Sequence, residues 1–310
     1  MSYQATAGSV LMISPHFPPS GNPQAFQSLR LAETLAHAGM QVEVLAAGAG
    51  NFEPANSHAG GPFRAQNGNI SISRFPPAGA LVRRARRFHR LFHPLDPYCY
   101  EPGLVRVLQQ TLRERSFDVI LSCSEPLVSH DAVFRVSHGR TRPLYIHWFS
   151  DPVPDSNHPE MMKLAWRRKR CDALIARCMQ HGSVVIGVTE EILKPFRAVA
   201  PAHAEILVLP HTFDPRQWPW PPNPASRRRH EAILLHAGSL YWTRHPFVFL
   251  DGIAMAAQKV RVRMMGSVSE EIRASLARKQ YPFPLEWTGS ATYEESHKAM
   301  GDADILCVID

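Results

Sequence analysis

The segment Ser14–Pro23 carries residue types suited to holding an anion. It places Ser20, Gly21 and Asn22 at the start of an expected helix, where backbone N–H groups have no partner within the helix. A phosphate group could accept hydrogen bonds from these N–H groups. The same residues also shape ordinary tight turns, so the segment predicts either an anion site or a turn.

A second glycine-containing segment, Gly238–Pro246, has the same place before a later helix. Gly238 permits close approach of the backbone to a ligand, Ser239 follows it, and Arg244 stands near the helix start. A guanidinium group there could hold a diphosphate through two parallel hydrogen bonds. The alternative is a solvated arginine on the surface.

Polar side chains also follow the apolar run Tyr145–Phe149. Asp151 and Asp155 come directly after it, and His147 lies within it. A carboxylate at the end of a strand is positioned for a ligand hydroxyl or for proton transfer, so Asp151 is the stronger catalytic candidate. His147 is the second candidate, although a histidine inside an apolar run is commonly a core residue.

The segment Ser122–His130 is less specific. Ser124 or Ser129 could cap the following helix, and His130 in its first turn could face a cleft or the solvent.

All these segments follow short apolar runs that alternate with amphipathic stretches, the pattern of βα units on a parallel sheet. Ligands of such sheets bind beyond the carboxyl ends of the strands. The first unit combines a strand at 10–14 with a helix at 24–38, ended by Gly39. We expect the apolar face of this helix to consist of Phe26, Leu29, Leu31, Leu35 and Ala38. Further strands are expected at 41–46, 70–75, 117–122, 143–149, 183–188 and 205–209, and helices near 102–115, 128–137, 159–181 and 189–200.

Residues 215–230 interrupt this rhythm with a proline-rich and arginine-rich stretch, which predicts a linker. The sequence thus predicts an N-terminal Rossmann-like domain at 1–214, the linker, and a partial C-terminal Rossmann-like domain at 231–310. In the latter we expect strands at 232–236, 260–265, 285–288 and 305–309, and helices around 246–258, 269–278 and 292–301. About 80 residues are few for such a domain, and the chain stops within an apolar strand, so we expect a truncated chain.

Composition restricts the partners. The 310 residues carry a net charge of +7, which favours nucleotide phosphates, anionic lipid or nucleic acid. No apolar run is long enough to span a bilayer, and the N-terminus lacks the features of a signal peptide, so a cytoplasmic location is expected. The five cysteines form no CxxC pair and predict free thiols, most of them buried. The basic and apolar stretch 81–92 suits the inner face of a membrane, or else a solvated helix packed on its domain.

Taken in order, segments from both halves resemble the retaining glycosyltransferases of family 4, which have the two-domain GT-B architecture. Val10–Gly39 is similar to the opening βα unit of that family, and 117–130 to its "FDVI…SSPP-S-H" stretch. The other similar segments are Asp151-Pro152 ("FRDPW"), Ile186–Glu190 ("VIAVSE"), Pro210–Pro215 ("PHSFDP"), His236–Pro246 ("HAGTLYGxRxP"), and Glu286–Gly289 with Ala303–Leu306.

The resemblance implies an α/β protein with two Rossmann-like parallel-sheet domains facing across a cleft, the second incomplete. It implies a nucleotide-diphosphate sugar as co-substrate, held mainly by the C-terminal domain, and a glycan or lipid-linked acceptor, held mainly by the N-terminal one. Arg244 and backbone N–H groups at Gly21 and Gly238 would neutralise the donor phosphates, with His211 of the "PHSFDP"-like segment nearby and without an obligatory metal or cofactor. In this family the leaving phosphate is thought to help deprotonate the acceptor, so a protein nucleophile is not required.

Two departures limit the carry-over. The arginine of "FRDPW" is Ser150 here and its tryptophan is Val153, so contacts of those side chains do not transfer. The paired-glutamate segment that holds the donor in this family would follow residue 310. We therefore expect this chain to lack part of its donor pocket and leave its activity open.

Other interpretations remain. A sugar-nucleotide epimerase can share the fold, and the basic stretch 81–92 fits a non-catalytic protein that docks on a membrane or on another transferase. A nucleic-acid binder is disfavoured, because the basic residues are dispersed and no aromatic platform is interleaved with them.

Overall fold

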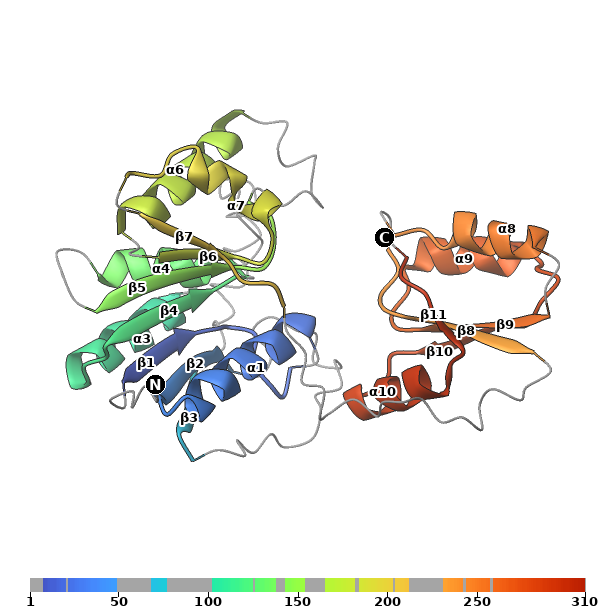
Figure 1. Cartoon of the computed structure of the whole chain (residues 1–310), viewed down its shortest axis with the longest axis horizontal. Coiled ribbons are helices and arrows are strands. Elements are labelled where there is room, and N and C mark those ends of the chain that lie inside the picture. The colour runs from blue at the N-terminus through green and yellow to red at the C-terminus, as the bar shows by residue number, and fades with distance from the viewer. Residues whose placement is uncertain are drawn as a thin grey trace, which may run out of the picture. The chain divides into compact units, whose positions relative to one another are not determined.

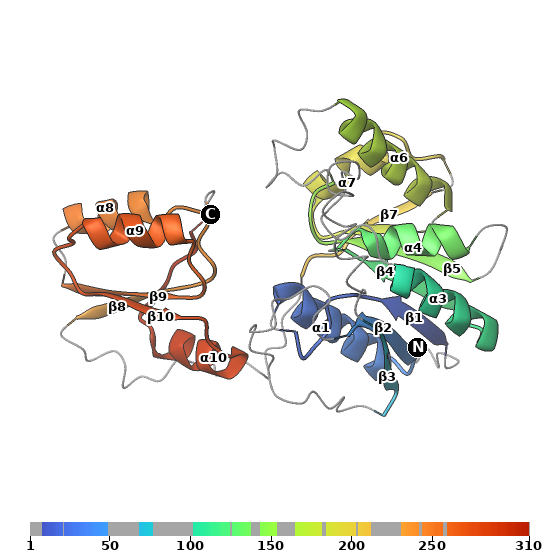
Figure 2. The same cartoon turned by 180° about the vertical axis from the view of Figure 1, so that it is seen from behind.

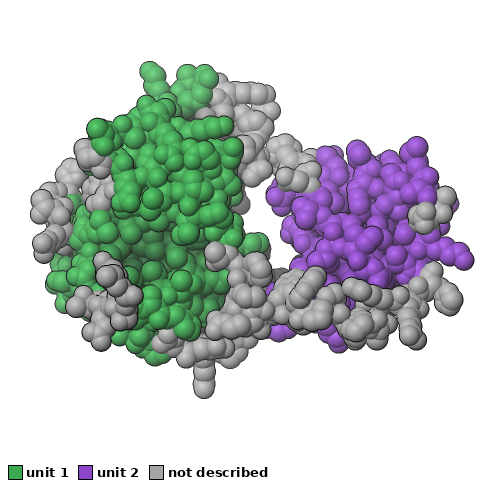
Figure 3. All heavy atoms as spheres, in the orientation of Figure 1, with its two compact units in different colours: residues 1–212 green, residues 213–310 purple. Residues whose placement is uncertain are grey.

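The computed structural model describes residues 8–20, 22–48, 68–76, 102–124, 126–137, 143–153, 165–181, 184–202, 204–211, 231–241, 244–256 and 259–309. The chain divides into two compact units, Met1–Thr212 and Phe213–Asp310 (Figure 3). The expected linker at 215–230, the basic stretch 81–92, Gly21, Cys99 and Asp155 lie outside the described residues.

Unit 1 is built on a seven-stranded sheet with the strand order β3-β2-β1-β4-β5-β6-β7 and parallel pairing throughout. The order reverses between β1 and β4, which is the switch point where ligands of such sheets bind. Its elements are β1 (Ser9–Ile13), α1 (Pro23–His37), β2 (Gln41–Ala47), β3 (Ile70–Phe75), α3 (Pro102–Glu114), β4 (Val119–Cys123), α4 (Val128–Val136), β5 (Leu144–Phe149), α6 (Ala165–His181), β6 (Val184–Gly187), α7 (Glu190–Arg197) and β7 (Glu205–Val208).

Helices cover both faces of this sheet (Figures 1 and 2). In β1, Val10 and Met12 share a core with α1, α6 and α7, while Leu11 and Ile13 pack with α3 and α4. Because both faces are covered, the strand is a continuous apolar run rather than an alternating one. The strand was predictable from sequence for this reason.

The prediction for the apolar face of α1 is partly wrong. Its fully buried residues are mostly small, whereas Leu29, Leu31 and Leu35 are only partly buried and Ala38 is exposed. Small side chains let the helix backbone approach the sheet closely, so the leucines flank the contact instead of forming it. The buried residues are Gln24, Ala25, Ser28, Ala32 and Ala36. The helix ends as predicted, with Gly39 in the left-handed region at φ 90°.

Unit 2 has a four-stranded parallel sheet in the order β10-β9-β8-β11, with its switch point between β8 and β11. Helices α8 and α9 cover one face and α10 lies on the other (Figures 1 and 2). Strand β11 is shorter than the predicted 305–309. The elements are β8 (Ala232–Ala237), α8 (Phe247–Met255), β9 (Val260–Met265), α9 (Glu270–Arg278), β10 (Leu285–Gly289), α10 (Tyr293–Asp302) and β11 (Ile305–Leu306).

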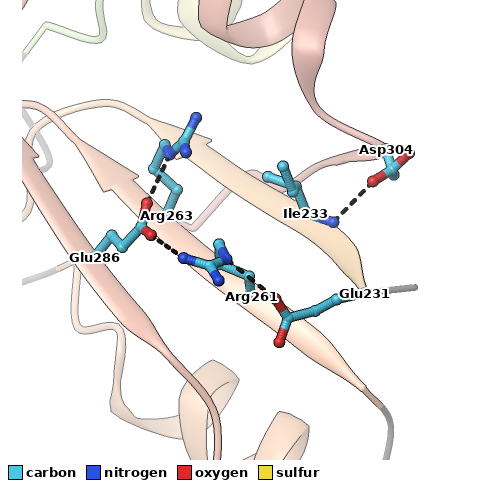
Figure 4. Close-up of polar contacts among 6 residues, drawn as sticks. All are labelled: Glu231, Ile233, Arg261, Arg263, Glu286 and Asp304. Atoms are coloured by element: carbon cyan, nitrogen blue, oxygen red, sulfur yellow. Dashed lines mark hydrogen bonds and ion pairs between the residues drawn. The ribbon is translucent and has the colours of Figure 1, made fainter. Parts of the chain in front are cut away.

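The face of this parallel sheet that points toward α10 carries charged side chains on β9 and β10. In β9, Arg261 and Arg263 alternate with the buried residues Val262 and Met264. Both guanidinium groups contact the carboxylate of Glu286 on β10, with Arg263 Nε 3.1 Å from it (Figure 4). Arg261 Nε also lies 3.1 Å from Glu231, and the main-chain N–H of Ile233 donates to Asp304 at 2.8 Å (Figure 4). Paired charges therefore stand where a doubly covered sheet usually has apolar residues.

Candidate functional site

The start of α1 lies at the switch point of unit 1. Asn22 is its N-cap, since Oδ1 accepts a hydrogen bond from the Gln24 N–H at 2.9 Å, and Ser20 Oγ accepts from the Asn22 N–H at 3.2 Å. The structure thus uses these two predicted side chains to order the turn and the helix start. Their backbone N–H groups also have partners within the turn, since the Ser20 N–H donates to Phe17 O at 3.3 Å and the Asn22 N–H to Ser20 Oγ.

Gln24, which the sequence reading missed, connects this helix with two neighbouring loops. Its Nε2 donates to the main-chain oxygen of Ser124 after β4, and its Oε1 accepts from Ser150 Oγ after β5 at 3.0 Å. Ser150 Oγ also lies 2.9 Å from the Ser124 oxygen and 2.7 Å from Asp151 Oδ2. A polar network therefore links the carboxyl ends of β1, β4 and β5.

The predicted residues Asp151 and His211 come together at this edge although 60 positions separate them in sequence. Partial enclosure lowers the pKa of His211, and the nearby charge of Asp151 opposes that shift. The ring of His211 also makes an edge contact with Trp148, with 5.9 Å between ring centroids. Asp151 is half-buried and His211 exposed, so both remain within reach of a ligand.

His147 lies in the core rather than with Asp151. It is fully buried, and its Nδ1 lies 2.7 Å from Ser122 Oγ, which also lies 2.7 Å from Nδ1 of the fully buried His130. The expectation that His130 faces a cleft or the solvent is wrong. The Ser122 hydroxyl has a single hydrogen and also lies 3.4 Å from Ile146 O, so at least one of the two histidines must donate from Nδ1.

Burial lowers the pKa of His130 far below its usual value, and the neighbouring His147 lowers it further. The ring of His130 also stacks on Phe149 at 4.3 Å between centroids. These contacts describe a packed polar cluster formed by β4, β5 and α4, which fits the core interpretation of His147.

The predicted loop of unit 2 lies at the carboxyl end of β8. The Gly238 N–H donates to Met265 O at 2.8 Å, and the Ser239 hydroxyl lies 2.8 Å from that of Ser267. The guanidinium of Arg244 lies over the ring of Tyr241, 5.3 Å from its centroid. Gly238, Ser239 and Arg244 therefore share one loop, with Ser239 exposed and the other two half-buried.

His236 is a second residue that the sequence reading did not select as a site residue. It is 6% exposed, its Nδ1 lies 3.1 Å from Cys307 O, and its Nε2 is buried without a hydrogen-bond partner among the described residues. Burial lowers its pKa, the hydrogen bond to Cys307 opposes this, and the charge of Arg244 lowers it again. The available sequence signal was a histidine inside the apolar run of β8.

Three glycines end or follow successive strands of unit 2 at this edge: Gly238 after β8, Gly266 after β9 and Gly289 as the last residue of β10. Gly266 has φ 131°, and a Cβ atom there would lie 2.2 Å from Gly238 O. Its N–H donates to Gly289 O at 2.8 Å, and Gly289 has φ 73°. The backbone at Gly238 and Gly266 is therefore packed closely, as in loops that approach a phosphate group, whereas Gly289 has nothing within 4 Å of its Cβ position and favours glycine through its φ angle alone.

The described part of the chain shows neither a metal-binding cluster nor a membrane-spanning helix. It contains no group of three or more His, Cys, Asp or Glu side chains arranged to hold a metal ion. Within the same residues, no helix has the length and apolar character needed to cross a bilayer. The cysteines described, 123, 171, 178 and 307, are free thiols, and the first three are buried.

Solved structures similar to this chain show its fold. HepE of Anabaena in complex with UDP and glucose has a TM-score of 0.61 at 14% identity, over 96% of this chain and 73% of that chain. The E. coli trehalose-6-phosphate structure bound with UDP-2-fluoro glucose has a TM-score of 0.61 at 14% identity, over 96% and 77%. The apo lipopolysaccharide outer core galactosyltransferase WaaB has 0.53 at 12%, over 96% and 73%. These likenesses show the GT-B fold with two Rossmann-like units.

Sequence comparison then gives the family. The profile of a glycosyl transferase 4-like domain matches residues 24–212, which is more than half of the chain. The protein belongs to this glycosyl transferase 4-like family and is a glycosyltransferase. No curated protein sequence matches it.

Proposed function

We propose that the protein transfers a sugar from a nucleotide-diphosphate sugar to a glycan or lipid-linked acceptor, with retention at the anomeric carbon. Family membership supports sugar transfer. The HepE and E. coli structures, which share the fold, contain UDP with a sugar or UDP-2-fluoro glucose. The observation that carries the proposal is the Gly238–Arg244 loop at the switch point of unit 2, where Rossmann-like sheets bind diphosphates.

The donor would bind at this loop. Gly238 carries no side chain that would keep a phosphate away from the loop, and Arg244 supplies a charge that does not titrate near neutral pH. The ring of Tyr241 beneath the guanidinium restricts its position. A nucleoside diphosphate leaving group gains negative charge during transfer, so a fixed guanidinium lowers the barrier without a metal.

The acceptor would bind on unit 1, beside Asp151 and His211. We assign to Asp151 a hydrogen bond from an acceptor hydroxyl, which orients that hydroxyl for attack. The leaving phosphate would take the hydroxyl proton, so Asp151 positions the acceptor and is not a nucleophile. His147 would support the core beneath this site, and its place with Ser122 and His130 favours that role.

The donor assignment is tested by titrating UDP into wild type and Arg244→Ala by calorimetry. Loss of a charged hydrogen-bonding group costs about 1.5–3 kcal/mol, so Kd should rise roughly 10- to 150-fold. Arg278→Ala is the matched control, because Arg278 closes α9 and contacts Ser275. Unchanged affinity in Arg244→Ala would remove Arg244 from the donor site.

The reaction itself is tested by supplying labelled nucleotide sugars and following the label. Label found on an added glycan or lipid-linked acceptor supports transfer, and the anomeric configuration of the product decides whether transfer is retaining. Conversion of the nucleotide sugar to its epimer without an acceptor would support the alternative enzyme activity. A protein that binds no nucleotide sugar would leave only the docking interpretation.

We also propose that residues 81–92 bring the protein to an anionic membrane surface, where lipid-linked acceptors lie. The support is their sequence, in which arginines and a histidine are mixed with leucine, valine and phenylalanine. Sedimentation with vesicles containing phosphatidylglycerol at low salt should retain the protein, and replacing the arginines at 83, 84, 86 and 87 with glutamine should release it. Equal retention of both proteins would contradict the proposal.

A further inference from the structure

One of the two ring nitrogens of His236 has a hydrogen-bond partner, and the other has none among the described residues. Burial lowers the pKa of His236, the hydrogen bond to Cys307 opposes this shift and the charge of Arg244 adds to it, so the ring is neutral near pH 7. A carbonyl oxygen can only accept, so the single ring hydrogen lies on Nδ1, 3.1 Å from Cys307 O. Nε2 is therefore a bare nitrogen that can only accept.

A buried acceptor without a partner is costly, and the packing of β8 does not require one here. On the same face of the sheet, His236 has the apolar neighbours Leu234, two residues earlier, and Met264, at the paired position of β9. An apolar side chain at 236 would suit these neighbours without leaving a buried nitrogen unpaired. Groups of this kind in native proteins call for a functional explanation.

Nε2 of His236 stands beside the first residue of the Gly238–Arg244 loop, where the nucleotide sugar is proposed to bind. A Cβ atom on Gly238 would lie 3.1 Å from Nε2 and 3.2 Å from Cε1. Apart from the chain neighbours of Gly238, no other described residue would lie within 4 Å of that atom. Gly238 is half-buried, and Arg244 is close enough for its charge to act on the imidazole. The bare nitrogen thus lies next to the side of the loop on which glycine has no side chain.

The chemistry of a nucleotide sugar divides between these two residues. Its diphosphate carries no hydrogen near neutral pH, so it accepts from a guanidinium and has nothing to donate to a bare nitrogen. The hydroxyl groups of the ribose and of the transferred sugar flank that diphosphate, and they do donate. A lone pair beside the phosphate site therefore fits a hydroxyl group.

We propose that His236 binds the nucleotide sugar, with Nε2 accepting a hydrogen bond from one of its hydroxyl groups. The inference rests on the proposed function and adds a contact that differs in kind from that of Arg244. An analogue without this hydroxyl would leave the buried nitrogen unpaired in the complex, so His236 would favour the complete ligand over its deoxy analogue.

His236→Asn and His236→Gln separate this role from a structural one. The asparagine amide can still donate to Cys307 O, from about the place of Nδ1, but has no atom at the place of Nε2. The glutamine amide reaches that place with an oxygen. Binding of UDP-glucose, or of GDP-mannose if it binds wild type more tightly, is measured by calorimetry on the full chain. We expect Kd to rise roughly 3- to 10-fold in His236→Asn and to recover in part in His236→Gln.

Deoxy analogues of the same ligand identify the hydroxyl group. The 2′-deoxy and 3′-deoxy forms test the ribose, and forms that lack single hydroxyls of the hexose test the transferred sugar. One of these analogues should bind wild type more weakly than the complete ligand, and His236→Asn should bind both with equal affinity. A loss of stability alone would weaken all the ligands alike, and unfolding temperatures measured without ligand report it separately.

The outcomes distinguish this inference from the proposed function. If Arg244→Ala weakens binding and His236→Asn does not, or if no deoxy analogue is coupled to His236, the hydroxyl contact is overturned and the proposed function stands. Calorimetry in two buffers of different ionisation heat adds a second test, since accepting a hydroxyl takes up no proton. Proton uptake that disappears in His236→Asn would show an imidazolium donating to the diphosphate and would also overturn the inference. If wild type binds neither nucleotide sugar, the nucleotide-sugar site fails, and this contact with it.

Discussion

The imidazole of His236 donates a hydrogen bond from Nδ1 to the main-chain oxygen of Cys307, 3.1 Å away, and so joins β8 to the residue after β11. Because the partner is a carbonyl, Nδ1 must carry the proton, and Nε2 is then the bare nitrogen of the neutral ring. That nitrogen faces Gly238, where a Cβ atom would lie 3.1 Å from it. His236 thereby disfavours residues larger than glycine at the first position of the proposed donor loop.

Gly238→Ala should therefore be destabilising in a way that depends on His236. The imidazole is buried and held by Cys307, so it resists the shift of a few tenths of an ångström that a Cβ atom would require, and overpacking of this kind costs about 1–3 kcal/mol. We expect a lower unfolding temperature and weaker UDP binding for Gly238→Ala. In the His236→Ala background the same change should cost clearly less, as measured by thermal unfolding of all four proteins. An equal cost in both backgrounds would show that the contact is not the cause.

Gly266→Ala should be more damaging than Gly238→Ala. Its φ of 131° is strained for any other residue, and a Cβ atom would lie 2.2 Å from Gly238 O, a backbone atom that cannot yield locally. We expect unit 2 to unfold at a much lower temperature, with loss of UDP binding. The matched control is Gly252→Ala, because Gly252 lies within α8 with nothing within 4 Å of its Cβ position. That change should stabilise α8 by up to about 1 kcal/mol.

The order of the strands and helices could be predicted from sequence because each βα unit carries local signals. Val10–Ile13 is apolar throughout, and Gly39 ends α1 in the left-handed region, as its position indicated. The apolar face of α1 could not be predicted as easily, since hydrophobicity favours Leu29, Leu31 and Leu35 over alanine. Packing distance, which the periodicity does not contain, decides that the small residues make the contact.

The loops of the candidate site could be predicted from sequence, but the hydrogen bonds between residues far apart in the chain could not. Asp151 and Arg244 stand at strand ends, where sequence alone selects them as ligand contacts. Gln24 and His236 were missed because their importance comes from burial beside a partner far away in sequence, Ser150 and Cys307 respectively. Residue type and spacing carry no information about such pairing.

Acid should destabilise unit 1 through its buried histidines. Burial lowers the pKa of His16 from 6.5 to about 4, and His130 shifts in the same direction. The unfolded chain then binds protons more readily than the folded one, so stability is full above pH 6.5 and is lost as pH falls toward 4. For His16 the loss amounts to about 3 kcal/mol. Urea unfolding of His16→Gln should show a smaller decrease between pH 6.5 and 4, and an unchanged decrease would mean that His16 is protonated in the folded protein.

Glu286→Gln should lower the stability of unit 2, because it removes the carboxylate of β10 with which Arg261 and Arg263 of β9 both form ion pairs (Figure 4). The side chains of Glu286 and Arg261 are 34% and 38% exposed, so salt screens their attraction. We therefore expect a small decrease in unfolding temperature at low salt that shrinks in about 1 M salt.

The direction of the pH effect follows from the same contacts. Hydrogen bonds from Arg261, and then from Arg263, lower the pKa of Glu286, so its contribution to stability is present above the unfolded pKa and is lost as pH falls through the folded one. Glu286→Gln should remove this part of the acid sensitivity of unit 2. Asp251→Asn is the control. Asp251 forms an ion pair with Lys279, and the side chains of this pair are more exposed than those of Glu286 and Arg261. Equal effects of the two substitutions would show that the shared carboxylate adds nothing beyond an ordinary surface ion pair. A larger effect of Glu286→Gln would mean that the paired charges stabilise the sheet face on which α10 lies.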